Sequence, residues 1–113
     1  MNKLKNTVQL IGRTGIEPIV RTFENGTKLA KFSLATNETI RDVNGKKTLT
    51  QWHQIVAWGR TAELIEKYLH KGQMVAVDGK LVNRAYKDNG GGNHRRTEVQ
   101  VHDIMMINKQ KAG

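Results

Sequence analysis

Two tryptophans, Trp52 and Trp58, are the residues of this sequence whose type and spacing most clearly suggest chemistry. They stand an even number of positions apart in an alternating stretch, so a β-strand would place both on one face, about 20 Å apart. The polar Gln54 shares that face, whereas Ile55 and Ala57 point to the other side. A core strand more usually groups its aromatics with its aliphatics, so we expect both indoles on an exposed surface, available to stack against a planar ligand.

The charge balance indicates the kind of ligand. The chain of 113 residues carries 19 Lys and Arg against 10 Asp and Glu, which gives a formal net charge of +9 and a pI of about 10.1. Such an excess favours a polyanionic partner, with nucleic acid first and an acidic membrane surface second. A basic soluble protein without a polyanionic partner is the alternative that charge alone leaves open.

Basic residues gather in two polar segments, 39–48 and 83–96, which we expect to be hairpin loops. The second contains a glycine-rich run, 88–93, predicted to be a flexible tip, and Tyr86, which is hard to bury there and is predicted to be a third stacking residue. We expect the two sides of this segment to present their basic residues together. Phosphate contacts, which give affinity without sequence choice, are predicted from Arg84, Lys87, Arg95 and Arg96, and then from Arg41, Lys46 and Lys47.

Five principal strands and one short helix are expected to position these side chains. Alternation and turn residues place the strands at 7–13, 28–36, 51–58, 74–82 and 97–107. A short extended piece over 19–23 precedes Asn25-Gly26, a hairpin signal because both residues tolerate positive φ. With the helix after the third principal strand, this order is typical of the all-β class and of a five-stranded Greek-key barrel with long basic hairpin loops, the OB-fold.

The helix is predicted over 62–71, with Thr61 as its N-cap and Gly72 closing its C-terminal end. Its apolar stripe consists of Leu64, Ile65, Tyr68 and Leu69, so Tyr68 is predicted to be a core residue rather than a ligand contact. Phe23 and Phe32 are also assigned to the core, since Phe32 alternates with aliphatic neighbours.

Other site chemistries find no support in the residue pattern. The sequence has no cysteine, and its histidines at 53, 70, 94 and 102 show no zinc spacing, so neither a metal site nor a cofactor is expected. Paired carboxylates, an activated nucleophile and a phosphate-cradling loop ending are also missing, and the chain is predicted not to be an enzyme. His53, on the strand face opposite the tryptophans, is predicted to have a structural or subunit-interface role.

A single domain over residues 1–108 is expected, followed by a short disordered end over 109–113. No apolar run approaches the ~18 residues of a membrane span, and the N-terminus has no signal-peptide core. The lack of cysteine fits a reducing compartment. We therefore expect a soluble intracellular protein with neither a membrane nor a small-molecule partner.

Several short motifs occur along the chain in an order and at a spacing that match a known family. They are Val8-Gln9-Leu10-Ile11-Gly12, Asn25-Gly26-Thr27, Phe32-Ser33-Leu34-Ala35-Thr36-Asn37, Trp52-His53, Gly59-Arg60, Tyr68-Leu69-His70-Lys71-Gly72 and Thr97-Glu98-Val99. Together, and not singly, these motifs make the chain resemble the bacterial single-stranded DNA-binding protein (SSB) family from Asn6 to Met106.

The resemblance implies an OB-fold that usually assembles as a homotetramer, with a dimer as the alternative, and that binds single-stranded DNA during replication, recombination and repair. It implies a bacterial cytoplasmic, nucleoid-associated protein that can also contact replication and repair proteins. Carried over by position, the family's stacking residues fall on Trp52, Trp58 and Tyr86. The family's basic positions fall on Arg21, Arg60, Lys71 and Arg84.

The sequence departs from the family pattern in three respects. Ile40 stands where the family commonly has a stacking tryptophan, and Gln54 replaces a usual arginine. Val82 and Ala85 thin the basic run around Arg84. Family members usually continue into a linker with an acidic tip that recruits partner proteins. This sequence ends at Gly113 without the tip, as a tail-less paralogue or a fragment of a longer protein would, and only in the first case is recruitment through the tip in doubt, while DNA binding is expected in both.

Two alternatives stay open at this point. An OB-fold accessory protein of the primosome type would mainly contact replication proteins and bind DNA weakly, which Ile40 and the thinner basic run would suit. A small barrel that binds RNA, as cold-shock-type proteins do, would use the same aromatic residues for stacking.

Overall fold

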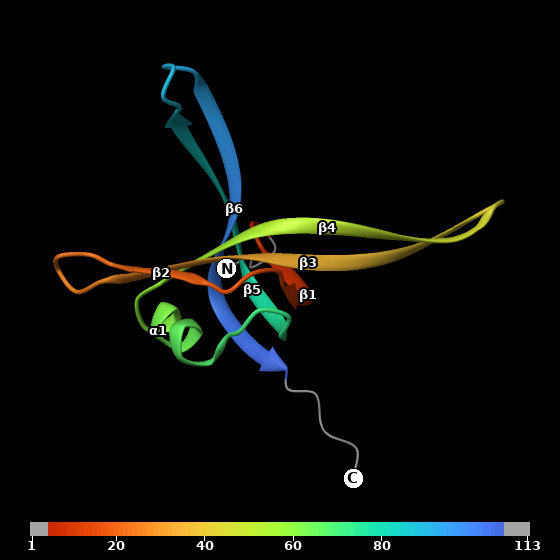
Figure 1. Ribbon diagram of the computed structural model, residues 1–113, viewed down its shortest axis with the longest axis horizontal. Coiled ribbons are helices and arrows are strands. Elements are labelled where there is room, and N and C mark those ends of the chain that lie inside the picture. Colours follow the sequence, from red (N-terminus) through yellow and green to blue (C-terminus); the bar gives the residue numbers. More distant parts are fainter. Residues whose placement is uncertain (1–4, 108–113) are drawn as a thin grey trace, which may run out of the picture.

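The computed structural model describes residues 5–107, which form six strands and one helix (Figure 1). In chain order the elements are β1 (Val8–Thr14), β2 (Ile19–Thr22), β3 (Lys28–Asp42), β4 (Gly45–Trp58), α1 (Gly59–Tyr68), β5 (Met74–Lys87) and β6 (Asn93–Ile107). The strands lie in the order β1-β5-β6-β4-β3-β2, and a further pairing of β1 with β3 closes a barrel. Because the short β2 only extends the edge of β3, the barrel has five strands, and the predicted all-β Greek-key OB-fold is confirmed.

The barrel closes through a short parallel pairing of β4 with β6 and a short antiparallel pairing of β1 with β3. The closure brings backbones so close that two positions have no room for a side chain. A Cβ on Gly12 would stand 2.2 Å from the carbonyl oxygen of Ala35, and one on Gly79 would stand 2.2 Å from that of Gln100. Gly12 therefore lies where β1 crosses β3.

The barrel interior and the inner face of α1 form one apolar core. Its largest fully buried side chains are Leu34, Ile55, Ile65, Leu69 and Val75. Phe32 is 3% exposed, so its predicted core position is confirmed. Phe23 is half-buried and lies outside this cluster, so its core assignment was wrong.

The helix starts and ends earlier in the chain than predicted. Its N-cap is Trp58 rather than Thr61, and no side chain caps it. The chain turns from β4 directly into the helix at Gly59, whose φ of +63° is the left-handed conformation that glycine adopts readily. At the other end the helix stops at Tyr68, so Gly72, with φ of +81°, belongs to the turn that leads into β5.

Only part of the predicted helix stripe is buried. Ala62, Ile65 and Leu69 face the core, whereas the side chains of Leu64 and Tyr68 are 44% and 57% exposed. The prediction that Tyr68 is a core residue was therefore wrong. The buried positions 62, 65 and 69 are three and four residues apart, so Leu64 and Tyr68, each one residue before a buried position, are turned about 100° away from it around the helix axis.

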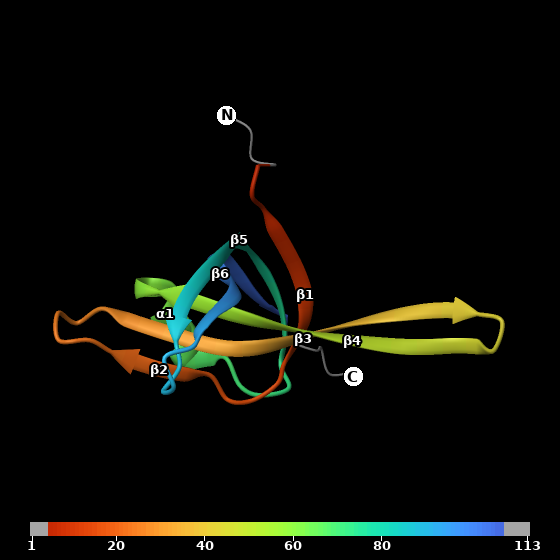
Figure 2. The ribbon, with the colours of Figure 1, turned by 90° about the horizontal axis from the view of Figure 1, so that it is seen from above.

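The two polar segments are paired β-ribbons rather than loops. β3 and β4 stay in register out to Asp42 and Gly45, and β5 and β6 stay paired out to Lys87 and Asn93. The ribbons leave the barrel in different directions (Figure 1), and β3–β4 extends well past it when the molecule is seen from above (Figure 2). Polar side chains predominate on both faces of the ribbons, so the hydrophobic alternation that signals a strand is weak in the sequence there.

Candidate nucleic-acid interface

The two tryptophans lie on one face of β4 and are open to solvent. The side chains of Trp52 and Trp58 are 58% and 38% exposed, and Gln54 between them is exposed as well. Val56, on the same face by alternation, is 3% exposed. A strand whose only role is packing would be expected to bury its large indoles. Here the indoles are exposed and smaller aliphatic side chains fill the core.

Trp52 lies against β1 and the start of the next turn, where a glycine gives it room. A Cβ on Gly15 would stand 2.6 Å from Cζ3 of Trp52 and 2.7 Å from Oγ of Ser33. This glycine therefore has a packing role at Trp52. Its missing side chain makes space for the indole ring.

Trp58 belongs to a stack of three side chains at the β2–β3 hairpin. The ring of Phe23 lies 5.9 Å from that of Trp58, centroid to centroid, with an interplanar angle of 20°. Cζ of Arg21 lies 5.3 Å from the centroid of the Phe23 ring. The structure thus brings the predicted phosphate contact Arg21 to the predicted stacking residue Trp58, through an aromatic residue that the sequence analysis had placed in the core.

The register of β5 with β6 divides the predicted basic cluster between two faces. Arg84 pairs with Arg96 and Tyr86 with His94, so these four share one face. Lys87 and Arg95 belong to the alternate positions and point to the other face. The expectation that all four basic residues act together beside Tyr86 was therefore wrong, because it treated this segment as a loop.

Arg84 is held by a buried carboxylate that the sequence analysis missed. Its Nε donates to Oε1 of Glu98 at 2.7 Å, and the Glu98 side chain is 4% exposed while that of Arg84 is 49% exposed. The ion pair fixes the guanidinium at the base of the ribbon. Its remaining N–H groups are the ones that can face a phosphate.

The Tyr86 ring has one titratable and one cationic neighbour. The imidazole of His94 stacks on its ring at 5.2 Å and 25°, and Cζ of Arg96 lies 5.2 Å from the same centroid. Tyr86 remains 44% exposed. The platform predicted from one tyrosine is therefore a group of three side chains.

The glycine-rich tip of this ribbon is a closed turn held by one aspartate. Oδ1 of Asp88 accepts from the backbone N–H groups of Gly90 and Gly92, at 2.9 and 2.7 Å. Oδ2 of Asp88 lies 2.5 Å from Nε2 of His94. The hydrogen bond with His94 lowers the pKa of Asp88 below its ordinary value, and the Gly92 amide adds to this effect. The sequence predicted a flexible tip because it contains three consecutive glycines, and did not foresee these bonds.

The β3–β4 ribbon also separates its basic residues by face. Arg41 and Lys46 pair with each other at positions in phase with Trp52, so they continue the tryptophan face outward. Lys47 pairs with Ile40 on the opposite face. Ile40 is 36% exposed, and it stands on the face away from the tryptophans.

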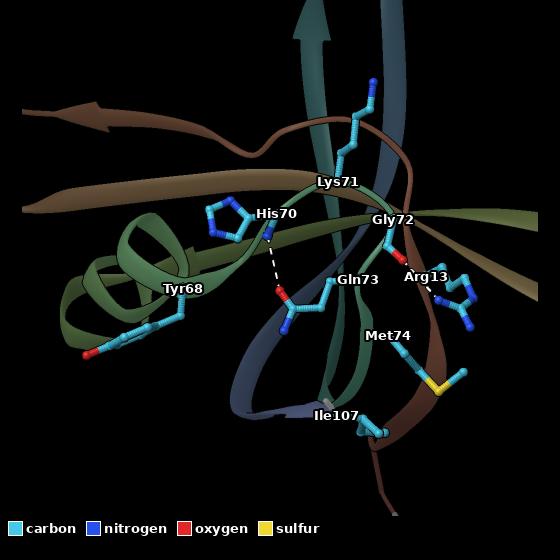
Figure 3. Close-up of a pocket in the computed structure, with 8 residues that line it drawn as sticks. All are labelled: Arg13, Tyr68, His70, Lys71, Gly72, Gln73, Met74 and Ile107. Atoms are coloured by element: carbon cyan, nitrogen blue, oxygen red, sulfur yellow. Dashed lines mark hydrogen bonds between the residues drawn. The ribbon is translucent and has the colours of Figure 1, made fainter. Parts of the chain in front are cut away.

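The other predicted contacts lie apart from these ribbons. Arg60 is exposed on α1, two residues after Trp58 in the chain. Lys71 lies beside a shallow hollow at the α1–β5 turn, and Figure 3 shows its side chain leading away from Met74 and Ile107. Arg13 borders the same hollow, and its guanidinium donates to the carbonyl of Gly72 at 3.0 Å, so it supports the turn.

His53 has a partner within its own chain. Its Nε2 lies 2.9 Å from the hydroxyl of Thr36 on the neighbouring β3. Among residues 5–107, no group of three or more His, Cys, Asp or Glu side chains is placed to hold a metal ion. In the same described range, no helix is long and apolar enough to cross a membrane.

The comparison with known proteins identifies the family. The model of the single-strand binding protein family matches residues 5–107. The chain belongs to this family. The family resemblance noted in the sequence is therefore confirmed over nearly the whole chain.

Three single-stranded DNA-binding proteins, each longer than the stretch that it shares with this chain, are similar to it in sequence. It is 37% identical over 110 residues to single-stranded DNA-binding protein 1 of Chlorobaculum tepidum, covering 96% of this chain and 68% of the relative. Single-stranded DNA-binding protein of Bacteroides thetaiotaomicron is also 37% identical, with coverage of 96% and 69%. Single-stranded DNA-binding protein 1 of Xylella fastidiosa is 33% identical, with coverage of 94% and 79%.

A solved structure of Plasmodium falciparum SSB in complex with single-stranded DNA has a closely similar fold. The TM-score is 0.85 at 40% identity, and the match covers 96% of this chain and all of the other.

Proposed function

We propose that this chain binds single-stranded DNA without sequence preference, in replication, recombination and repair. Bases stack on its exposed aromatic rings while basic side chains neutralise the phosphates. The observation that carries this proposal is the pair of exposed indoles, Trp52 and Trp58, on one face of β4 in a member of the single-strand binding protein family. A stacked base is worth roughly 1–3 kcal/mol, so two or three such residues can supply most of the non-ionic affinity.

The roles of the basic residues follow from their positions. On faces that carry an aromatic platform, the phosphate contacts are Arg21, Arg41, Lys46, Arg84 and Arg96. The remaining phosphate contacts lie on other faces or elements, so the DNA strand must pass around the ribbons to reach them. They are Arg60, Lys47, Lys71, Lys87 and Arg95. Each contact should contribute about 0.7 to the salt slope of binding to a single strand.

The test is a pair of matched double variants at the two indoles. Replacing Trp52 and Trp58 together by alanine removes both π-faces, and we expect a loss of affinity for oligo-dT of at least tenfold. Replacing both by phenylalanine keeps two π-faces and should restore most of that affinity. Near-unchanged binding by the alanine variant would contradict the proposal.

The alternatives make different predictions in the same assay. The names of the relatives do not favour the accessory-protein reading, in which DNA binding is weak. An RNA-binding barrel would prefer an RNA oligomer over a DNA oligomer of matched sequence in direct competition. A strong preference for the RNA oligomer would show that RNA rather than DNA is the ligand.

Assembly of several copies is part of this proposal. The outer face of the β1–β5–β6 sheet places Ile11 opposite Ala76 and Ala76 opposite Met105. Ile11 and Met105 are 64% and 66% exposed, which leaves apolar side chains open to solvent on one protomer. This surface supports the homotetramer that the family resemblance implies. A subunit-interface role for His53 belongs to the same proposal.

We also infer a binding rather than a catalytic role and a location in the bacterial cytoplasm, at the nucleoid. The support is that the relatives are named for DNA binding and that the three sequence relatives above are bacterial. Localisation of a fluorescent fusion in a bacterial host would test the second point. The single OB-fold domain is proposed to span 1–108, and the expected disordered end at 109–113 lies outside the described residues.

A further inference from the structure

The tip of the β5–β6 ribbon holds a histidine that the proposed function does not use. His94 lies opposite Tyr86 in the ladder, stacks on its ring at 5.2 Å, and has a side chain that is 46% exposed. On the same face, Arg96 lies over the Tyr86 ring. The three side chains form one exposed group of two stacked rings and a guanidinium.

We propose that His94 is a further DNA-contacting residue, which extends the Tyr86 platform, and that Asp88 is the positioning residue that orients its imidazole. The proposal rests on single-stranded DNA binding as the proposed function. A base needs a flat surface and a nearby positive charge to hold its phosphate, and an imidazole offers both within one side chain.

The turn explains how Asp88 can orient a ring at an exposed tip. Its Oδ1 is fixed by two backbone amides of the turn, and its Oδ2 is left for Nε2 of His94. Gly92 leaves room for this arrangement, because a Cβ there would stand 2.9 Å from Oδ2 of Asp88. The backbone therefore fixes the carboxylate, and the carboxylate fixes the imidazole.

Protonation of the imidazole should strengthen the contact with DNA. A protonated ring has an N–H on both nitrogens, so it can keep Asp88 through Nε2 and offer Nδ1–H to a phosphate. The pKa of Asp88 is lowered, so its carboxylate stays ionised throughout the range in which histidines titrate. Other charged or titratable side chains of the ribbon are Tyr86, Arg84, Arg96 and Glu98 on the face of His94, and Lys87 and Arg95 on the other face.

The experiment measures oligo-dT affinity at pH 6 and pH 8 for the whole chain and four variants. His94→Ala removes the ring, and His94→Phe keeps a ring without a charge. Asp88→Asn keeps the oxygen for the turn amides but removes the carboxylate charge. His102→Ala is the matched control, because His102 is an exposed histidine of the same strand outside the ribbon. Circular dichroism and sedimentation confirm that each variant has the native fold and assembly.

We expect His94→Ala to lose about fivefold in affinity at pH 8 and more at pH 6. His94→Phe should bind like the native protein at pH 8 but lack its gain on acidification. In Asp88→Asn the imidazole loses the carboxylate that orients it, so affinity should fall toward that of His94→Ala. His102→Ala should behave like the native protein.

Two results would overturn the inference while leaving single-stranded DNA binding intact. One is native affinity in His94→Ala at both pH values. The other is a loss in His94→Ala that His94→Phe fails to restore at pH 8, since the ring would then not be acting as a stacking surface. A native protein that shows no preference for oligo-dT over duplex would overturn the proposed function and this inference with it.

Discussion

At the scale of single residues, each stacking tryptophan depends on a neighbour that the sequence analysis did not assign to the site. Trp52 has its place because Gly15 has no side chain. Trp58 is backed by Phe23, which in turn lies beneath Arg21. A base that stacks on either indole meets a ring whose orientation is already fixed, so less entropy is lost on binding.

Gly15→Ala should disturb Trp52 without changing any DNA contact directly. The new Cβ would stand 2.6 Å from the ring, so the indole or β1 must shift, at a cost of about 1–3 kcal/mol in the free energy of unfolding. We expect a changed tryptophan emission spectrum and weaker oligo-dT binding. Gly90→Ala is the control, because its Cβ would meet Asp88 at an ordinary 3.5 Å. An unchanged emission spectrum in Gly15→Ala would contradict this account of the Trp52 site.

Phe23→Leu should weaken DNA binding more than it weakens the fold. The substitution keeps apolar volume but removes the ring that stacks on Trp58, an interaction of about 0.5–1.5 kcal/mol. Phe32→Leu, at a buried core position, should instead lower the melting temperature and leave affinity for oligo-dT nearly unchanged. Comparing titration and thermal unfolding for the two variants checks this, and the reverse pattern would return Phe23 to the core.

At the scale of elements, strand register decides which basic residues work together. Because β5 and β6 pair out to Lys87 and Asn93, each side chain of the ribbon has a defined face. Arg84 and Arg96 therefore accompany Tyr86, and Lys87 and Arg95 do not. A flexible loop, by contrast, would have allowed all four to reach one ligand.

Glu98→Gln should separate the stability of this ribbon from its affinity for DNA. The buried carboxylate pairs with a half-exposed guanidinium, so its removal should cost roughly 1–2 kcal/mol in the free energy of unfolding. The substitution releases Arg84 from its ion pair and raises the net charge of the chain by one, so affinity for oligo-dT at low salt should stay the same or rise. Thermal unfolding and a binding titration check the two effects. A large drop in affinity would show that the ion pair itself is needed to place Arg84.

The sequence predicted the elements where hydrophobic alternation was strong and misjudged them where it was weak. The core of β3, the Asn25-Gly26 turn and the barrel order followed from alternation and turn chemistry. The outer halves of the ribbons could not be predicted, since both faces there are polar and the pairing is set by the partner strand. The helix start was misplaced because Gly59 begins the helix without a side-chain cap.

At the scale of the site, single aromatic residues were found and their partners were not. The pattern of two tryptophans on a polar strand face is visible in the sequence alone. The stacks of Phe23 on Trp58 and of His94 on Tyr86 join different strands, so only the register of those strands could reveal them. Asp88 carried a weak local signal, because an aspartate before glycines often accepts turn amides.

At the scale of the whole molecule, three hairpin ribbons extend from one small barrel, and the outer face of its β1–β5–β6 sheet carries exposed apolar side chains. The β2–β3 and β3–β4 hairpins run to opposite sides, and β5–β6 rises from the barrel between them (Figure 1). Stacking residues on separate ribbons suit a DNA strand that passes over the surface of the molecule rather than into one pocket. The apolar face of β1, β5 and β6 remains for contacts between copies.

Ile11→Glu should reduce the assembly to smaller species while each protomer still binds DNA. The side chain is 64% exposed on one protomer, so the fold tolerates the charge, but a subunit interface would not. Ile19→Glu on β2 is the control, since Ile19 is 65% exposed and lies outside that sheet face. Sedimentation velocity reports the mass of each variant. The native mass in Ile11→Glu would exclude this face as the interface.

Quenching of tryptophan fluorescence reports directly whether bases stack on the exposed indoles. Oligo-dT is titrated into the native protein over a series of salt concentrations, with a duplex of equal length as control. We predict strong quenching by the single strand, little by the duplex, and a salt slope no steeper than its phosphate contacts account for at about 0.7 each, since stacking itself is not ionic. Weak quenching with a steep slope, similar for both nucleic acids, would contradict the account and show that a basic surface binds charge indiscriminately.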